Sequence, residues 1–247
     1  MTGATPNPAF AFPGGIGVSH LRVYDTPAPD GLAGGTPHLH TVCTEAYVVV
    51  GGSGAVHTLT LTGHEVWPLE PGAFVWFTPG TIHRLVNHGD LEIIVLMANA
   101  GLPEAGDMVI TLPPATLADR DAYWRAASLP DHDRTTAGPG DAPRRRRDLA
   151  VPVFLDMIDA MNAGDDTSLR RFYDAAQRLV EPSLAEWEGI WRAGPLDAAN
   201  TTGTQLAALA SGDASHLLSA AVRTMPPPPD ERRFGCCGTL GTYVDTR

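Results

Sequence analysis

The chain has 247 residues, enough for one large domain or two small ones, and 43% of them are hydrophobic, as is usual in water-soluble proteins. Its net charge of −11 argues against a nucleic acid or an anionic membrane as a partner, and no apolar run reaches the roughly 18 residues of a membrane span. The N-terminus lacks a basic region followed by an apolar one, and the three cysteines are odd in number, so we predict a cytoplasmic protein without signal peptide or disulfide framework.

Residues 1–30 are predicted to form an N-terminal arm and a first strand. The first 15 residues contain three prolines and three glycines, which favours an extended arm that packs on the rest of the protein or on a partner subunit. Residues 16–24 alternate in part between apolar and polar side chains, as in a half-exposed strand. A loop rich in proline and glycine, residues 27–37, follows this strand.

Two histidines and a glutamate come directly after this loop. Alternate residues of a strand point to the same face, so His38 and His40 can project together into one interior. Glu45 is an odd number of residues beyond His40, and on an unbroken strand it would face the opposite way. We therefore predict a bend at residues 41–44, followed by a new strand that runs from Glu45 to a glycine-rich turn at residues 51–54.

The next part of the chain reads as a series of short strands. Residues 55–61 and 65–69 are predicted to form a hairpin, and residues 73–77 an apolar strand after a Pro-Gly turn. A second turn at Thr78-Pro79-Gly80 leads into a strand that begins near His83 and ends at residues 87–90. Residues 91–98 and 109–112 complete the set, which is typical of a β-sandwich or barrel.

His38, His40, Glu45 and His83 together offer three imidazoles and one carboxylate. This donor set suits one divalent transition metal, and spacing alone does not choose between Fe, Mn, Ni, Zn, Co and Cu. In six-coordinate geometry two positions stay open for water, substrate or dioxygen, as in a catalytic rather than a structural site. The alternative is a barrel that has kept this pattern of residues without binding a metal.

The first of these segments resembles the first motif of the cupin superfamily. That motif has His-x-His, three or four residues, a Glu, six residues and a Gly. His38, His40, Glu45 and Gly52 match it in this order.

The second segment resembles the second cupin motif, Gly-x₅-Pro-x-Gly-x₂-His-x₃-Asn. Thr78 stands where the proline is usual and Pro79 follows one position later, whereas the other motif residues match: Gly72, Gly80, His83 and Asn87. The resemblance covers roughly residues 31–112 and implies a mainly β fold, a cupin-type barrel (double-stranded β-helix) at residues 31–115. It also implies metal ligation by the two motifs' histidines and glutamate, and a possible homodimer.

Other residues near the motifs have more than one interpretation. Tyr47 shares the parity of Glu45 and His57 lies on the next strand, so both are candidate catalytic residues lining the metal cavity, with core packing as the alternative. Arg84 is adjacent to His83 and is expected to point away from the metal, at the surface. Asn87 is expected to support a turn through its side chain. Cys43 is interpreted as a buried structural cysteine rather than a ligand.

The composition changes after residue 113, and the remaining chain is predicted to be mostly helical. Residues 116–147 are read as a helix and a polar linker, with the arginines at 144–147 as its solvated end rather than an anion site. Residues 148–247 form a small α-helical region with an irregular tail containing two adjacent cysteines. This region could cap the barrel mouth, mediate dimerisation, or do neither.

These features favour a metal-dependent enzyme that acts on a small oxygenated molecule bound to the metal, with dioxygenase-type oxidation as the first choice. One alternative is a sugar isomerase or epimerase of cupin type, although no obvious cluster of basic residues near the motifs awaits a phosphate. The other is a small-ligand-binding or regulatory protein without catalysis. The expected partner is a small molecule.

Overall fold

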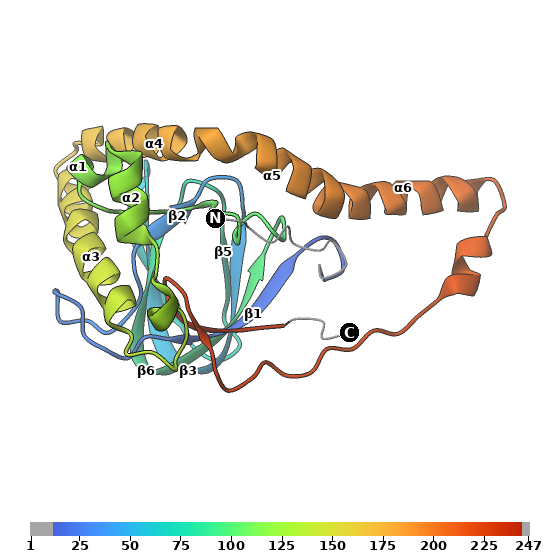
Figure 1. The fold of residues 1–247 in the computed structure, drawn as a ribbon, viewed down its shortest axis with the longest axis horizontal. Helices are drawn as coiled ribbons and strands as arrows, with labels where there is room; N and C mark the ends of the chain where they lie inside the picture. The colour runs from blue at the N-terminus through green and yellow to red at the C-terminus, as the bar shows by residue number, and fades with distance from the viewer. Residues whose placement is uncertain (1–11, 244–247) are drawn as a thin grey trace.

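The computed structural model describes residues 12–243. A β-barrel forms one part of the molecule, helices cover one side of it, and a helical arm extends away before the chain returns to the barrel (Figure 1). The mainly β architecture with a helical C-terminal region predicted from the sequence is confirmed. Among the described residues, no helix is both long and apolar enough to cross a membrane.

Within residues 12–243, nine strands form one sheet in which every neighbouring pair is antiparallel. The main path runs β4-β3-β6-β1-β9-β8, with β5 on β3, and β2 between β6 and β7. The strands are β1 (Gly17–Val23), β2 (His38–His40), β3 (Glu45–Thr60), β4 (Gly63–Leu69), β5 (Phe74–Phe77), β6 (Ile82–Met97), β7 (Met108–Ile110), β8 (Arg233–Phe234) and β9 (Gly238–Thr242).

Strands β3 and β6 are longer than predicted, because the expected turns at residues 51–54 and 87–90 lie inside them. The two irregular segments face each other, since Ser53 pairs with Gly89 and Gly54 with Asn87. The register shifts three times between Val49 and Gly54, as in a β-bulge. Both strands therefore bend at the same place without ending, which lets one pair of strands serve both halves of the barrel.

The helices are α1 (Pro114–Leu117), α2 (Arg120–Ala127), α3 (Asp141–Asn162), α4 (Thr167–Val180), α5 (Leu184–Trp191) and α6 (Asp197–Ala210). Short 3-10 turns lie at Asp131–Asp133, Glu181–Ser183 and Ser215–Ser219, and a π-helical segment, η4 (Arg192–Leu196), joins α5 to α6. Apolar side chains of α3 and α4, such as Phe154 and Leu169, share a core with Leu39, Ile82 and Ile110 of the barrel. A second core, which includes Tyr47, Leu85 and Ile93, fills the barrel itself.

The run of four arginines was predicted to be the solvated end of a linker, and this prediction is wrong. The run lies in the first turns of α3, and the side chains of Arg146 and Arg147 are buried. Arg147 donates to the carbonyl oxygens of Thr26 and Pro27 at 2.7 Å, and Arg146 donates to those of Ala127 and Gly235 at 2.8 Å. Arg147 thus fastens α3 to the loop that precedes the first motif, and Arg146 fastens it to the end of α2 and to the segment after β8.

The tail with the two cysteines is not irregular. Strand β9 pairs with β1 from Ser19–Thr242 to Val23–Gly238, and β8 pairs with β9. Cys237 packs in the barrel core, so the end of the described chain completes the sheet rather than belonging to the helical region. The predicted boundary between residues 147 and 148 falls inside α3.

Candidate metal centre

Four side chains from three strands converge inside the barrel. His38 on β2 is the direct cross-strand partner of His83 on β6, His40 lies two residues further along β2, and Glu45 is the first residue of β3. One possible ligand atom from each of the four lies within 4.8 Å of the other three, and all four residues are buried. The residues predicted as metal ligands therefore meet at one point.

Asp107 forms the bend that brings Glu45 back toward the two histidines. Its buried carboxylate accepts hydrogen bonds from the backbone N–H groups of Thr41 (2.9 Å), Val42 (2.8 Å) and Cys43 (3.1 Å). The predicted bend at residues 41–44 is present, and this side chain from the loop before β7 is its physical cause. The sequence analysis did not find Asp107, because it lies in a loop without a motif.

Hydrogen bonds fix which ring nitrogen of each histidine faces the centre. Nδ1 of His38 donates to the carbonyl of Thr36 (2.8 Å), and Nδ1 of His83 donates to that of Thr81 (3.2 Å). Nδ1 of His40 lies 3.1 Å from Oδ2 of Asp107, and as a donor it completes a carboxylate–histidine pair. The proton is thereby placed on Nδ1, and Nε2 remains as the donor atom that a metal needs.

Two atoms at the centre are buried without hydrogen-bond partners. Oε2 of Glu45 lies 3.1 Å from Nε2 of His83 and 3.3 Å from Nε2 of His40. Even so, Oε2 of Glu45 and Nε2 of His83 form no hydrogen bond within the described residues. Unpaired buried polar atoms are costly, and a cation at the point where they converge would satisfy both. The donor set and its geometry therefore fit a divalent metal.

The charges of these groups depend on one another. Burial favours the neutral carboxyl of Glu45, but His83 and His40 outweigh it and hold its pKa well below the usual range. Burial also favours neutral His40, but the hydrogen-bonded carboxylate of Asp107 and the nearby carboxylate of Glu45 outweigh it and raise its pKa to about 9. For His38, burial and the neighbouring imidazoles lower the pKa well below its ordinary value. In the metal-free site, His40 is thus protonated at neutral pH.

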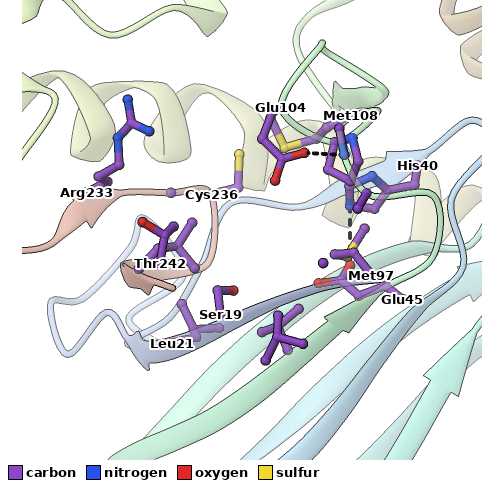
Figure 2. Close-up of a pocket in the computed structure, with 18 of the residues that line it drawn as sticks. Ser19, Leu21, His40, Glu45, Met97, Glu104, Met108, Arg233, Cys236 and Thr242 are labelled. Atoms are coloured by element: carbon purple, nitrogen blue, oxygen red, sulfur yellow. Dashed lines mark hydrogen bonds and ion pairs between the residues drawn. The ribbon is translucent and has the colours of Figure 1, made fainter. Parts of the chain in front are cut away.

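A cavity of about 860 Å³ opens beside these ligands (Figure 2). One wall is a face of the sheet, where Ser19 of β1 pairs with Val95 of β6 and Thr242 of β9, and all three line the cavity. Another wall comes from α5 and η4, through residues that include Ile190 and Gly194. The helical region predicted without a defined role therefore contributes directly to the cavity.

Tyr47 lies behind the ligands rather than on the cavity wall. Its side chain is fully buried in the barrel core, with its ring centroid 5.3 Å from that of Phe77 and 6.4 Å from that of His83. Burial, together with the charge of Glu45, raises its pKa well above the ordinary value, so the phenol stays protonated. Its hydroxyl forms no hydrogen bond within the described residues, and the cavity-lining residues do not include it.

His57 does not line the cavity, because its side chain lies on the other face of the sheet. Thr58 is the cross-strand partner of His83, whereas His57 pairs with Arg84 and lies 3.3 Å from the ring of His64. Arg84 points away from the metal as expected, but it is not at the surface. Its side chain is 1% exposed and bonds twice to Asp30 in the loop after β1.

Two smaller expectations agree with the structure. The side chain of Asn87 donates to the carbonyl of Val23 (3.1 Å) and accepts from the backbone N–H groups of Gly89 (2.9 Å) and Leu91 (3.1 Å). Cys43 is a buried free cysteine in the core between barrel and helices, and it does not belong to the group of converging ligands.

Glu104 is a further residue that the sequence analysis missed. It lies on the same loop as Asp107 and lines the cavity, and one carboxylate oxygen accepts from the backbone N–H of Gly101 at 3.0 Å. Figure 2 shows its carboxylate above the cavity, close to Met108 and on the same side as His40. It is a carboxylate that can meet a bound molecule without being one of the four converging ligands.

One family model and several solved structures are similar to part of this chain. Residues 26–99 match the family model "Cupin domain". A double-stranded β-helix protein from Klebsiella pneumoniae is 19% identical with a TM-score of 0.28, and the match covers 38% of this chain and 71% of that one. The ketoisomerase WlaRB from Campylobacter jejuni is 14% identical with a TM-score of 0.28, over 33% of this chain and 60% of that one.

A third similar structure, the DMSP lyase DddQ from Ruegeria pomeroyi, is 21% identical with a TM-score of 0.26, and the match covers 34% of this chain and 36% of that one. The chain thus spans less than two thirds of the length of these last two proteins. No match was found among curated proteins. The matched family model, the two motifs and the barrel that brings their residues together lead to one conclusion: residues 26–99 are a cupin domain.

Proposed function

We propose that this protein is a metal-dependent cupin enzyme whose substrate is a small molecule with two adjacent oxygen atoms. The observation that carries the proposal is the convergence of His38, His40, Glu45 and His83 at one end of a cavity large enough for such a molecule. His38, His40 and Glu45 also line the cavity, so a metal held by the four residues would be within reach of a bound molecule.

When bound there, a divalent transition metal would act as a Lewis acid toward the substrate oxygens and, if redox-active, would support oxidation by dioxygen. The protein's own contribution is to hold three Nε2 atoms and one carboxylate in place, and to enclose the substrate between apolar side chains such as Val95, Met97 and Met108. These walls exclude water from the reacting atoms. We take dioxygenase-type oxidation of a hydroxy-ketone, enediol or hydroxy-acid as the first candidate reaction.

One observation favours a second candidate, isomerisation or epimerisation. The carboxylate of Glu104 enters the cavity while one of its oxygens stays fixed by Gly101. A carboxylate in this position can take a proton from a carbon next to a carbonyl group of the substrate and return it to a neighbouring atom. In this proposal Glu104, rather than Tyr47 or His57, is the acid–base residue.

The test is a substrate panel with two readouts on protein reconstituted with Fe²⁺, Mn²⁺, Co²⁺, Ni²⁺ or Zn²⁺. Oxygen uptake with hydroxy-ketones, catechols and hydroxy-acids detects the first reaction, and deuterium incorporation from D₂O, followed by NMR, detects the second. The Glu104→Gln variant is expected to lose deuterium exchange while retaining metal. A protein that binds one metal and the chelating compounds but turns over none of them would favour a ligand-binding role instead.

A further inference from the structure

The cavity has a second chemically distinct end, formed by β8 and the segment beside it. Arg233 is the cross-strand partner of Leu240, which in turn is the partner of Leu21. Directly paired residues project to the same side of a sheet, and all three line the cavity. Figure 2 shows Arg233 at the opposite end of the cavity from His40 and Glu45.

Arg134 brings a second guanidinium to the same end. Its carbonyl accepts from the backbone N–H of Phe234 at 2.8 Å, so its segment runs next to β8, and it also lines the cavity. Its Nε is held by the carbonyl of Leu129 (3.2 Å) and the carboxylate of Asp131 (3.1 Å), which leaves its two terminal amino groups free to donate. Within residues 12–243, the side chain of Arg233 forms no hydrogen bond or ion pair.

The carboxylates that also line the cavity do not neutralise these two arginines. Glu45 belongs to the metal centre, and Glu104 is bonded to Gly101. Glu186, on α5, forms no ion pair with either arginine among the described residues. In a chain with a net charge of −11, this end of the cavity therefore presents two guanidiniums whose only anionic partner among the described residues is Asp131, which pairs with Nε of Arg134. Guanidinium groups bind carboxylates and phosphates through paired hydrogen bonds.

Apolar side chains separate the two ends. Leu21 and Leu240 lie next to Arg233 on the sheet, whereas Val95 and Met97 continue the same wall toward Glu45, which is the cross-strand partner of Met97. A ligand that fills this space lies next to the four metal-binding residues at one end, apolar side chains in the middle and two guanidinium groups at the other end.

We infer that the substrate is an elongated anion, with two adjacent oxygens at one end, an apolar middle, and a carboxylate or phosphate that pairs with Arg233 and Arg134. This inference rests on the proposed function, since the first end has a role only if the four ligands hold a metal. It also revises the expectation that no basic residues await an anionic group. The two arginines come from segments far from both motifs in the sequence, and only the fold places them at the cavity.

Chelating probes of graded length test the inference without knowledge of the substrate. Hydroxamates bind a metal through two adjacent oxygens, and the visible spectrum of the Co²⁺-loaded protein reports their binding. The series comprises acetohydroxamate and hydroxamates with two to six methylene groups that end in a carboxylate, a phosphonate or a methyl ester. At one chain length, an anionic tail is expected to bind about 5-fold more tightly than its ester.

Variants then test whether the higher affinity of the anionic hydroxamate over its ester depends on the two arginines. Arg233→Ala and Arg134→Ala should each reduce this affinity difference, and the double variant should abolish it. Acetohydroxamate should bind all the variants as it binds the wild type. Arg233→Glu should reverse the preference in favour of an amine-terminated hydroxamate. Arg170→Ala serves as the matched control, because Arg170 pairs with Asp166 on the exposed side of α4 and does not line the cavity.

The outcomes separate this inference from the proposed function. If Co²⁺ and acetohydroxamate bind but no anionic tail of any length gains affinity, the inference is overturned while the metal site stands. A gain that survives in the double variant overturns it as well. If neither Co²⁺ nor acetohydroxamate binds, the proposed function fails first. The relative gains of carboxylate and phosphonate tails identify which anion the arginines prefer.

Discussion

At the scale of single residues, Asp107 has two structural roles, one at the backbone bend and one at His40. Its carboxylate holds the bend at residues 41–43 through three backbone N–H groups, and it orients the ring of His40. Such partners of metal-binding histidines contribute to affinity almost as strongly as the ligands themselves.

We therefore expect Asp107→Asn to weaken metal binding by about 10- to 100-fold, because the amide is a poorer acceptor for the Nδ1–H of His40. Competition with a chromophoric chelator measures this change. Asp133→Asn is the matched control, since Asp133 also accepts from backbone N–H groups, those of Gly140 and Ala142, but far from the ligands. The control should lower the free energy of unfolding by about 1 kcal/mol without changing metal affinity. Equal metal affinities in wild type and Asp107→Asn would contradict this role.

Metal binding should release a proton, because His40 has a pKa of about 9 in the metal-free site. A metal ion has to displace that proton, so apparent affinity should rise about tenfold per pH unit through neutral pH and level off above about pH 9. Isothermal titration in buffers of different ionisation enthalpy should detect about one proton released per metal at pH 7.5. Release of no proton at this pH would contradict the assignment.

The raised pKa of His40 makes metal affinity increase with pH, but it makes the stability of the metal-free protein decrease with pH. Because folding raises the pKa of His40 above its ordinary 6.5, the folded state binds this proton more tightly than the unfolded state. The resulting stabilisation is complete below about pH 6.5 and is lost as the pH rises through about 9. Chemical unfolding of the metal-free protein across this range should show the decline, and the His40→Ala variant should not.

The four ligands could be predicted from the sequence because their spacing is regular, whereas Asp107 could not, because it acts on residues more than 60 positions earlier in the chain. The face on which His57 lies could not be predicted for a similar reason. Tyr47 and Val49 of β3 lie in the barrel core at odd-numbered positions, whereas beyond the bulge the even-numbered Val56 lies in that core and Thr58 pairs with His83. The bulge between them changes the parity, and alternation counted along the sequence does not include it.

At the scale of secondary structure elements, the shared bend of β3 and β6 depends on Gly52. Its φ is 67°, in the left-handed region, and a Cβ added there would lie 2.1 Å from the carbonyl oxygen of Asp90. The glycine-rich segment was predicted to end a strand, since the sequence shows glycines but not which backbone lies against them.

We expect Gly52→Ala to lower the free energy of unfolding by about 1–3 kcal/mol or more, through strain and this close approach. Urea denaturation measures the change. Gly51→Ala is the control, because its added Cβ would meet Glu92 at an ordinary 3.7 Å and its φ is not in the left-handed region. The bend would not depend on Gly52 if both substitutions had the same small effect.

The arginines at the start of α3 show the same limit of sequence reasoning. Arg145 is exposed and Arg147 is buried against the loop that contains Thr26 and Pro27, although the two residues have the same chemistry. Their difference arises from where the helix begins and from the barrel surface on which it packs. A charge run alone predicts a solvated segment, and here two of its four members are structural.

At the scale of the whole molecule, the barrel was predictable because both motifs and their turns lie in one continuous part of the chain. The cavity was not, since its walls come from segments throughout the sequence. Strand β1, the loop with Glu104 and Asp107, helix α5 and the returning strands β8 and β9 all contribute residues to it. Figure 1 shows how the chain leaves the barrel along α5 and α6 and comes back to it with β8 and β9.

Metal content of protein purified without added metal, measured by mass spectrometry for wild type, His40→Ala and His57→Ala, tests the central claim most directly. Both substitutions remove one imidazole from the barrel, but only His40 faces the converging ligands. We expect about one divalent transition metal per chain in the wild type and in His57→Ala, and little in His40→Ala, with all three proteins folded. Full metal occupancy in His40→Ala, or its loss in His57→Ala, would contradict the assignment of this site.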